Sequence, residues 1–309
     1  MEDHDQRLKT LFQSFFAELL ELFWSKWAKR LDARKPEWLD KEVFPNPPDG
    51  HRRVLDLLAK VPIQPGVGPL PGNPKELLAL VHVEIDSSER TTVAKEQLWQ
   101  AYSHLRGKYR MPVLPVAVYL NVGLEGIGVD EYTETFDDLE VVRFHYLYAG
   151  LRGLDGLEYL KGQNLLGVGL SSLMKVPADR APELGATAID RIAQSELDDE
   201  RKYMLAECVE AYLPLDAAGR QQFEKLIGSS DFKGAKVMNK TSRELGREEG
   251  RREATQESAQ RFLSELLEER FGTISEAVRS RLRTVTDEEA SRLFKAAIRA
   301  TSLKELGLE

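Results

Sequence analysis

Leu77-Leu-Ala-Leu-Val-His-Val-Glu-Ile85 is an apolar run that only His82 and Glu84 interrupt. Residues 62–74, which come before it, are rich in proline and glycine and predict a long loop. A helix is predicted directly after it, over residues 89–109. An apolar run of this length between a loop and a helix predicts a β-strand at the centre of a sheet.

A second apolar run, Val113-Leu-Pro-Val-Ala-Val-Tyr-Leu120, predicts a strand that is buried on both faces. Pro115 lacks a backbone N–H, so we expect an edge position or a bulge at this residue. Residues 141–147 would add one further strand. The glycines between these two segments are interpreted as turn residues: Gly123, Gly126 and Gly128.

The N-terminal part of the chain predicts helix first and strands second. Apolar residues recur at helical spacing over 6–30, which predicts one amphipathic helix with an apolar stripe wide enough to pack on a sheet. Short strands are predicted at 39–44 and 54–58. This order of elements predicts an α/β fold in which a mixed sheet is flanked by helices, spanning about residues 1–150.

The rest of the chain is predicted to be helical. A helical extension over 151–235 would contain four helices, at 165–174, 181–195, 199–212 and 217–227, with the single cysteine, Cys208, in the core. The chain would continue as a charged linker helix at 236–260 and a small all-α tail at 261–309. The tail core is predicted to consist of Leu263, Leu266, Leu267, Val278, Leu282, Leu293 and Phe294.

Within the linker, small residues recur every four positions at Gly246, Gly250 and Ala254, so they line one face of a helix. Two interpretations stay open for this face. The helix is either solvated along its charged length or makes a close helix–helix contact in a homodimer, which would run through residues 243–270.

Composition narrows the functional classes. Hydrophobic residues make up 42% of the 309-residue chain and charged residues 30%, which is typical of a globular protein. The net charge of −8 argues against a generally basic protein that coats nucleic acid. One cysteine excludes an intrachain disulfide framework and a cysteine-cluster zinc site. We find no membrane-spanning run and no secretory signal, so we expect a soluble, cytoplasmic protein.

Three acidic residues, Asp56, Glu84 and Asp86, are candidates for a catalytic metal site. Side chains alternate along a strand, so His82, Glu84 and Asp86 would project to one side. If the segment with Asp56 is a neighbouring strand, three carboxylates converge where Mg²⁺ prefers oxygen ligands. The alternative is that Asp56 begins a turn and that Glu84 and Asp86 only mark a strand end. His82, on the same face as Glu84, would either hydrogen-bond Glu84 and line the site or be a structural histidine.

Several segments together resemble a known family. They are Asp3 to Phe23, Leu39-Asp-Lys-Glu-Val-Phe44, Leu55-Asp-Leu57, Val81-His-Val-Glu-Ile85 and Met111-Pro-Val-Leu-Pro-Val116. In order and spacing they resemble the Rpn-type recombination-promoting nucleases, often labelled putative transposases, of the PD-(D/E)xK superfamily. The resemblance covers roughly residues 3–175. Residues 260–305 resemble a small C-terminal helical domain of unknown function that often follows such nucleases.

The resemblance implies a restriction-endonuclease-like fold and a Mg²⁺- or Mn²⁺-dependent DNA endonuclease linked to recombination or transposition. Asp56 takes the place of the family's first-strand acid and Glu84 that of the (D/E), and both would bind the metal. Asp86 stands where the superfamily has lysine and the Rpn group usually has glutamine. As a catalytic residue, Asp86 would be a third metal ligand or would position the attacking water, although it lacks the N–H donor that lysine or glutamine would supply to orient that water. Glu18 or Glu21 would supply an extra acid.

Further residues are candidates for supporting roles. The resemblance implies that Gln97 and Gln100, on the predicted helix, face the site. Basic residues on which DNA phosphates would dock are Arg52, Arg53, Arg106, Lys108 and Arg110, although surface solubility explains them equally well. Two alternative functions stay open: a catalytically degenerate nuclease fold that acts as a protein- or DNA-binding module, and a hydrolase of small phosphorylated substrates.

Overall fold

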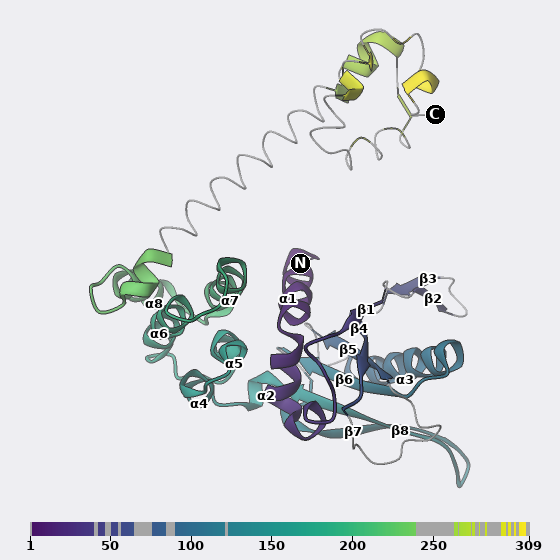
Figure 1. Ribbon diagram of the computed structural model, residues 1–309, viewed down its shortest axis with the longest axis horizontal. Helices are drawn as coiled ribbons and strands as arrows, with labels where there is room; N and C mark the ends of the chain where they lie inside the picture. Colours follow the sequence, from purple (N-terminus) through teal and green to yellow (C-terminus); the bar gives the residue numbers. More distant parts are fainter. Residues whose placement is uncertain are drawn as a thin grey trace. The chain divides into compact units, whose positions relative to one another are not determined.

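The computed structural model describes residues 2–39, 43–46, 51–54, 57–64, 76–84, 90–120 and 123–238, together with short runs between 263 and 306. Contacts divide the chain into two compact units, Met1–Met238 and Asn239–Glu309. The first unit holds the sheet and nearly all described helices, and it is shown in Figure 1.

A six-stranded mixed sheet forms the centre of the first unit, in the order β1-β4-β5-β6-β8-β7. Strand β6 runs parallel to both of its neighbours, β5 and β8, whereas the other strand pairs are antiparallel. The coarse α/β prediction is therefore confirmed. The strands are β1 (Glu37–Trp38), β4 (Leu57–Pro62), β5 (Glu76–Glu84), β6 (Val113–Tyr119), β7 (Gly126–Phe136) and β8 (Leu139–Gly150).

A separate two-stranded ribbon precedes β4. It consists of β2 (Val43–Asn46) and β3 (His51–Val54), paired in antiparallel register. The predicted strand at 39–44 overlaps the start of β2, and the predicted strand at 54–58 overlaps the end of β3 and the start of β4. Residues 40–42, 55 and 56 lie outside the described part. Most of the predicted loop at 62–74 also lies outside it, from residue 65 onward.

Helices cover both faces of the sheet. Helices α1 (Glu2–Ser14) and α2 (Phe16–Ala28) pack on one face, and α3 (Arg90–Tyr109) packs on the other. Alternation along β5 explains the division, because Ala79 packs with the α1–α2 side whereas Leu78 and Leu80 pack with α3. A strand that is apolar on both faces therefore lies at the centre, as its sequence predicts.

The predicted helix over 6–30 is in fact two helices. Phe15 separates them with φ −113° and ψ 32°, and Trp24 interrupts α2 with φ −135°. Both helices nevertheless contribute to one core, through residues such as Leu8 and Phe12 from α1 and Leu19 from α2. The amphipathic pattern thus correctly indicated packing on the sheet, but it did not show the breaks.

Strand β6 gives Pro115 a local edge position, as expected. This proline lies near the start of a central strand, with Leu80 of β5 as its register partner. Pairing with β8 begins one residue later, at Val116. Pro115 is tolerated because β6 has a neighbour on only one side at that point.

Strand β7 was not predicted. Gly126 and Gly128 belong to this strand and not to a turn. The irregular spacing of glycines concealed the alternation that follows them. Gly123 does adopt the left-handed backbone expected of a turn glycine, with φ +121°, and a Cβ there would lie 2.5 Å from the ring of Tyr119.

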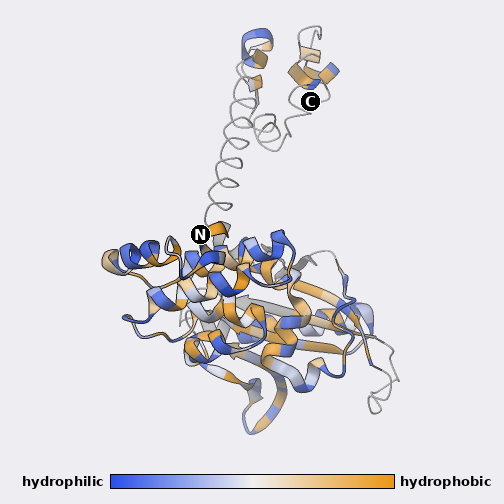
Figure 2. Cartoon of the chain, turned by 60° about the vertical axis from the view of Figure 1, so that its left-hand side comes forward, coloured by the Kyte–Doolittle hydropathy of each residue, from blue (hydrophilic) through white to orange (hydrophobic). Residues whose placement is uncertain are grey.

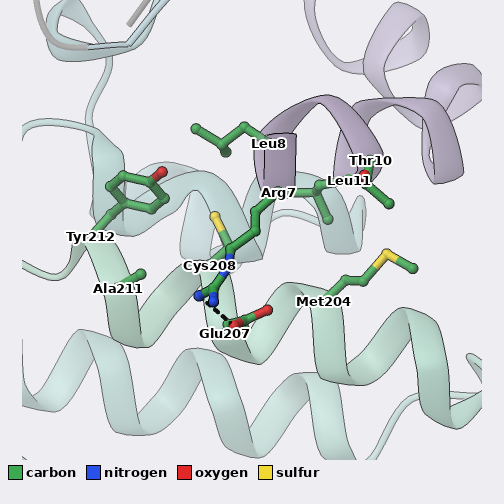
Figure 3. Close-up of a pocket in the computed structure, with 9 residues that line it drawn as sticks. All are labelled: Arg7, Leu8, Thr10, Leu11, Met204, Glu207, Cys208, Ala211 and Tyr212. Carbon is green, nitrogen blue, oxygen red and sulfur yellow. Dashed lines mark ion pairs between the residues drawn. The ribbon is translucent and has the colours of Figure 1, made fainter. Parts of the chain in front are cut away.

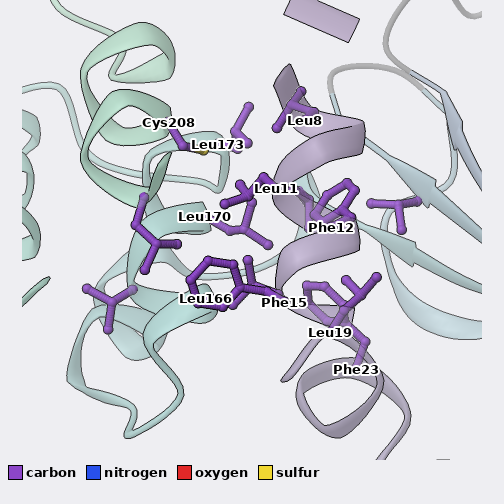
Figure 4. Packing of buried hydrophobic residues seen from close by; sticks show 14 of the residues in the cluster. Leu8, Leu11, Phe12, Phe15, Leu19, Phe23, Leu166, Leu170, Leu173 and Cys208 are labelled. Atoms are coloured by element: carbon purple, nitrogen blue, oxygen red, sulfur yellow. The ribbon is translucent and has the colours of Figure 1, made fainter. Parts of the chain in front are cut away.

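The helical extension shares a core with α1 and α2. Figure 4 shows Leu166, Leu170 and Leu173 packing toward Leu11 and Phe15. The predicted helices are present, and two of them, α7 and α8, begin at an aspartate that caps the first turn, as Asp198 caps α7. These elements are η1 (Leu151–Gly153), α4 (Gly156–Lys161), α5 (Leu165–Leu170), η2 (Ser171–Leu173), α6 (Ala181–Ala193), α7 (Asp199–Tyr212) and α8 (Ala217–Ile227).

The second unit has its own small hydrophobic cluster, in which Leu263, Leu267, Val278 and Leu282 are buried as predicted and η3 (Leu303–Leu306) contributes Leu303. Phe294 is exposed, so it is not a core residue. Most of the predicted linker helix and the small residues at 246, 250 and 254 lie outside the described residues. Within the described part, no helix is long and apolar enough to cross a membrane.

Candidate functional site

The strand that begins directly after Asp56 in the sequence and the strand that ends at Glu84 are neighbours. Strands β4 and β5 are antiparallel and hydrogen-bonded, with Leu57 opposite Val81, so the start of β4 runs beside the end of β5. Glu84 is the last residue of β5 and the register partner of Tyr119 in β6. Asp56 and Asp86 lie outside the described residues, as do the side chains of Glu84 and His82.

A connected polar network lies on the α3 side of the sheet and reaches the strand position beside Glu84. The Lys95 ammonium of α3 pairs with Asp130 Oδ2 of β7 at 2.6 Å. The Tyr146 hydroxyl of β8 donates to the same oxygen at 2.6 Å. The Tyr119 and Tyr146 hydroxyls lie 3.1 Å apart, and since Tyr146 has spent its one proton on Asp130, Tyr119 is the donor in this pair.

The electrostatics of the network follow from its partial burial. Burial alone would raise the pKa of Asp130, but the hydrogen bonds from Lys95 and Tyr146 outweigh it and hold the pKa below the usual 3.8. Burial, followed by the hydrogen bonds with Asp130 and Tyr119, raises the pKa of Tyr146 far above its ordinary value. Asp130 is therefore ionised and Tyr146 neutral at pH 7, and Lys95 balances the carboxylate.

The network joins α3, β6, β7 and β8 through side chains that are distant in sequence. It fixes the first half of α3 against the sheet next to the end of β5. The positive charge of Lys95 is already balanced by Asp130. Sequence reasoning missed Lys95, Asp130 and Tyr146 because no local pattern links them. Alternation along β7 would place Asp130 on the same face as Tyr132, but this strand was not predicted.

The two glutamines of α3 lie on either side of its buried Leu98. Gln97 is half-buried, and Gln100 donates to Glu96 Oε1 at 3.0 Å, which is a contact within the helix surface. Both glutamines lie in the central part of α3. Their described contacts do not link them to the Lys95 network.

Glu18 and Glu21 lie on α2, which covers the opposite face of the sheet from α3. Glu18 Oε1 pairs with the Arg201 guanidinium of α7 at 2.7 Å. The same guanidinium donates to the Ser14 carbonyl and stacks over the Phe15 ring at 3.9 Å. Glu18 is thus engaged in tying α2 to the helical extension, while exposed Glu21 faces Arg34 at 3.8 Å.

These residues line a polar cavity of about 390 Å³ between α2, the 33–36 segment and α7. Its charged members are Glu18, Glu21, Arg34 and Arg201. Arg201 Nε is buried without a hydrogen-bond partner, whereas Nη2 of the same guanidinium donates to the Ser14 carbonyl and to Glu18. The cavity is separate from the network around Lys95.

The basic candidates fall into two groups. Arg52 and Arg53 belong to β3 of the separate ribbon, with Pro45 and Phe44 as register partners. Arg106, Lys108 and Arg110 lie at the end of α3. A helix that connects two parallel strands runs back along them, so this end lies near Leu78, roughly 20 Å along β5 from Glu84. Only a DNA duplex that follows the length of the sheet would reach both Glu84 and the basic residues at the end of α3.

A second cavity, of about 160 Å³, lies between α1 and α7 (Figure 3). It is lined mainly by apolar side chains, and the Arg7–Glu207 ion pair of 2.7 Å closes one side. Cys208 lies in its wall, and burial raises the pKa of this thiol to about 12. The thiol is therefore protonated at neutral pH and is a core residue, as predicted, and not a nucleophile.

The described residues include no metal-binding cluster. Among the residues that the structure describes, no group of three or more histidine, cysteine, aspartate or glutamate side chains is placed to hold an ion. Asp56, Asp86 and the Glu84 side chain lie outside that set. Their carboxylate oxygens are the donor type that Mg²⁺ and Mn²⁺ take, and the pairing of β4 with β5 is compatible with a shared ion.

No protein-family model matches this chain, and no curated protein and no solved structure is detectably similar to it.

Proposed function

We propose that this chain is a Mg²⁺- or Mn²⁺-dependent DNA endonuclease of the Rpn type, built on a restriction-endonuclease-like core. The observation that supports the proposal best is the antiparallel pairing of β4 with β5. Asp56 directly precedes β4 in sequence, and Glu84 ends β5. Neighbouring strands that run in opposite directions bring the beginning of one beside the end of the other, as a two-carboxylate site requires.

In this proposal Asp56 and Glu84 hold the divalent ion, which would polarise the phosphodiester and lower the pKa of a bound water. Asp86 accepts a hydrogen bond from the attacking water and orients it. Two carboxylates are the usual protein contribution to a Mg²⁺ site that also takes up phosphate oxygens. The substrate phosphate supplies the remaining negative oxygen ligands.

The Lys95–Asp130–Tyr146–Tyr119 network has a supporting role. It connects Tyr119, the register partner of Glu84, to α3 and the β7–β8 pair. A metal site tolerates little movement of its ligands, so a network that stiffens the adjacent strand ends favours a constant geometry. These residues position the site and do not contact the substrate in this proposal.

The test is cleavage of supercoiled plasmid DNA by the purified full chain with Mg²⁺ or Mn²⁺. We expect nicking that chelation abolishes, and loss of detectable nicking in Asp56→Ala and Glu84→Ala. Glu158→Ala is the matched control, because this exposed acid lies on α4 of the helical extension and belongs to no candidate site. Cleavage that survives both active-site changes would overturn the proposal.

A second candidate is a catalytically degenerate nuclease fold that binds a protein. Asp86 at the usual lysine or glutamine position and the exposed apolar hairpin described below favour it. Calorimetric titration with Mg²⁺ and Mn²⁺ separates the two functions. Heat of binding that disappears in Glu84→Ala supports the nuclease, whereas an absence of binding at millimolar concentration supports the binding module.

A further inference from the structure

The β7–β8 hairpin exposes most of the large apolar side chains found on the described surface. Of seven such residues that are exposed in the described part of the chain, five belong to this hairpin. They include Val129, which is 61% exposed, and Phe136, which is 77% exposed. We call the five together the hairpin patch: Ile127, Val129, Phe136, Leu139 and Val141.

The patch arises because the sheet extends beyond its helical cover. Ile127 and Val129 are the cross-strand partners of Ala149 and Leu147, which are buried in the α1–α2 core. These two exposed residues continue the same face of the sheet past the point where that core ends, whereas Phe136 and its partner Leu139 lie on the opposite face by alternation along β7. In Figure 1 the end of the hairpin projects away from the body of the unit, and Figure 2 shows hydrophobic and hydrophilic segments mixed along it.

Strand β7 is also an edge. It terminates the sheet order and spans 11 residues, so roughly 35 Å of backbone has no second strand partner among the described strands. Proteins usually shorten or cover such an edge, because its free N–H and C=O groups accept an added strand. A long edge that borders exposed apolar residues is suited to strand addition.

Charge distinguishes between the possible partners. Residues 126–150 contain six acidic residues and one arginine. Arg143 and His145 already contact Glu131, and Lys95 already contacts Asp130. The turn residues Asp137 and Asp138 are exposed and have no ion pair within the described residues. The hairpin therefore presents net negative charge beside its apolar patch.

This charge disfavours two partners. DNA phosphates would be repelled by the acidic edge. A second copy of the chain, paired β7 to β7, would bring Asp130, Glu131 and Glu134 of one strand against the same acids of the other, and like charges on neighbouring strands are destabilising. The complementary partner is a protein segment that combines apolar with basic side chains.

We propose that the β7 edge and the hairpin patch bind an extended segment of a partner protein in which apolar residues alternate with lysine or arginine. The segment adds to the sheet as a strand beside β7. Its apolar side chains cover Ile127 and Val129, and its basic side chains, which lie on the opposite face, are near Glu134 and the acids of the turn. This surface is independent of the proposed nuclease site.

The first test uses a fluorescein-labelled decapeptide of alternating valine and lysine, titrated with the full chain and followed by fluorescence anisotropy. The control peptide has the same composition with the valines and lysines in two blocks. We expect saturable binding that is at least tenfold tighter for the alternating peptide and that weakens with salt. Equal binding of both peptides, or no saturable binding, would overturn the proposal.

Two variants locate the binding. Val129→Lys removes an apolar contact and adds a repelling charge, so we expect at least tenfold weaker binding. Val237→Lys is the matched control, because Val237 is similarly exposed but lies outside the hairpin, and it should bind as the wild type does. Asp137→Asn with Asp138→Asn should weaken binding about fivefold at low salt, since asparagine also tolerates the positive φ of Asp137.

Hydrogen exchange tests the mode of binding. Added peptide should slow amide exchange in residues 126–136 and leave buried Phe144–Ala149 of β8 unchanged. Protection that is absent from β7 contradicts strand addition. Sedimentation of the chain without peptide gives the remaining outcome: a dimer that Val129→Lys dissociates would show that a second copy occupies the patch, and the proposed partner would be wrong.

Discussion

The Tyr146 hydroxyl donates a hydrogen bond to Asp130 Oδ2 at 2.6 Å, directly across the β7–β8 pair. Lys95 of α3 reaches the same oxygen, so one carboxylate oxygen joins a helix to two strands. A hydrogen bond to a charged group contributes more to stability than one between neutral groups. This contact is therefore the first to test.

We expect Tyr146→Phe to lower the free energy of unfolding by about 1–2 kcal/mol, measured by urea denaturation. The change removes a nearly buried hydroxyl and leaves both Asp130 and Tyr119 with one hydrogen bond fewer. Tyr132→Phe is the control. Its hydroxyl also donates to a carboxylate, Glu134, but at an exposed position, so the loss should be within about 0.5 kcal/mol. Equal losses in the two variants would contradict a special role for the Tyr146 contact.

The pKa of Asp130 predicts a pH dependence of stability. Because this pKa is lower in the folded protein than the usual 3.8, the ionised carboxylate stabilises the fold at pH values above 3.8. That contribution is lost as the pH falls through the lowered pKa. The difference in unfolding free energy between wild type and Asp130→Asn should thus be constant from pH 5 to about 7 and shrink below pH 3.8. A difference that grows on acidification would disprove the lowered pKa.

Glu18 is expected to be structural and not a metal ligand. Glu18→Gln should lower stability by about 0.5–1.5 kcal/mol, because the pair with Arg201 is only partly shielded from water, with side-chain exposures of 34% and 25%. It should leave plasmid nicking unchanged, whereas Glu84→Gln should remove it. Loss of nicking in a folded Glu18→Gln protein would instead make Glu18 the extra acid that the family resemblance implies.

Cys208 gives a direct measure of core packing, since it is the single cysteine of the chain. Its thiol has a pKa of about 12 because it is buried, with Glu207 as a smaller influence. The thiolate fraction at pH 8 is therefore very small in the folded state. Reaction with a disulfide reagent should be on the order of 100-fold slower in the native protein than in urea. Comparable rates would mean that the core between α1 and α7 opens readily.

How much could be predicted from the sequence depends on how strong the local pattern of apolar residues is in each element. The run at 77–85, the helix at 89–109 and the helices after 165 were predicted close to their bounds, since each has a strong local pattern of apolar residues. Strand β7 was missed, because its outer positions carry acids and glycines instead of a clean alternation. The break at Phe15 was also missed, since a change in backbone direction leaves the apolar spacing nearly intact.

The candidate site shows the same division. Asp56 and Glu84 were selected from sequence alone, because a carboxylate in apolar surroundings is costly unless it contacts water, an ion-pair partner or a metal. That β4 pairs with β5 is a property of the assembled sheet, as are the positions of Glu18 beside Arg201 and of Arg106 at the far end of α3. The sequence could not place these residues relative to one another.

Local patterning was sufficient to establish the α/β class, the central apolar strands and the helical second half of the first unit, because hydrophobic spacing is set by residues a few positions apart. The tertiary structure alone determined the strand order, the Lys95–Asp130–Tyr146–Tyr119 network and the uncovered end of the β7–β8 hairpin. Each of these depends on contacts between residues far apart in the chain, and the free energy of such contacts exists only once the whole sheet and its helices have assembled.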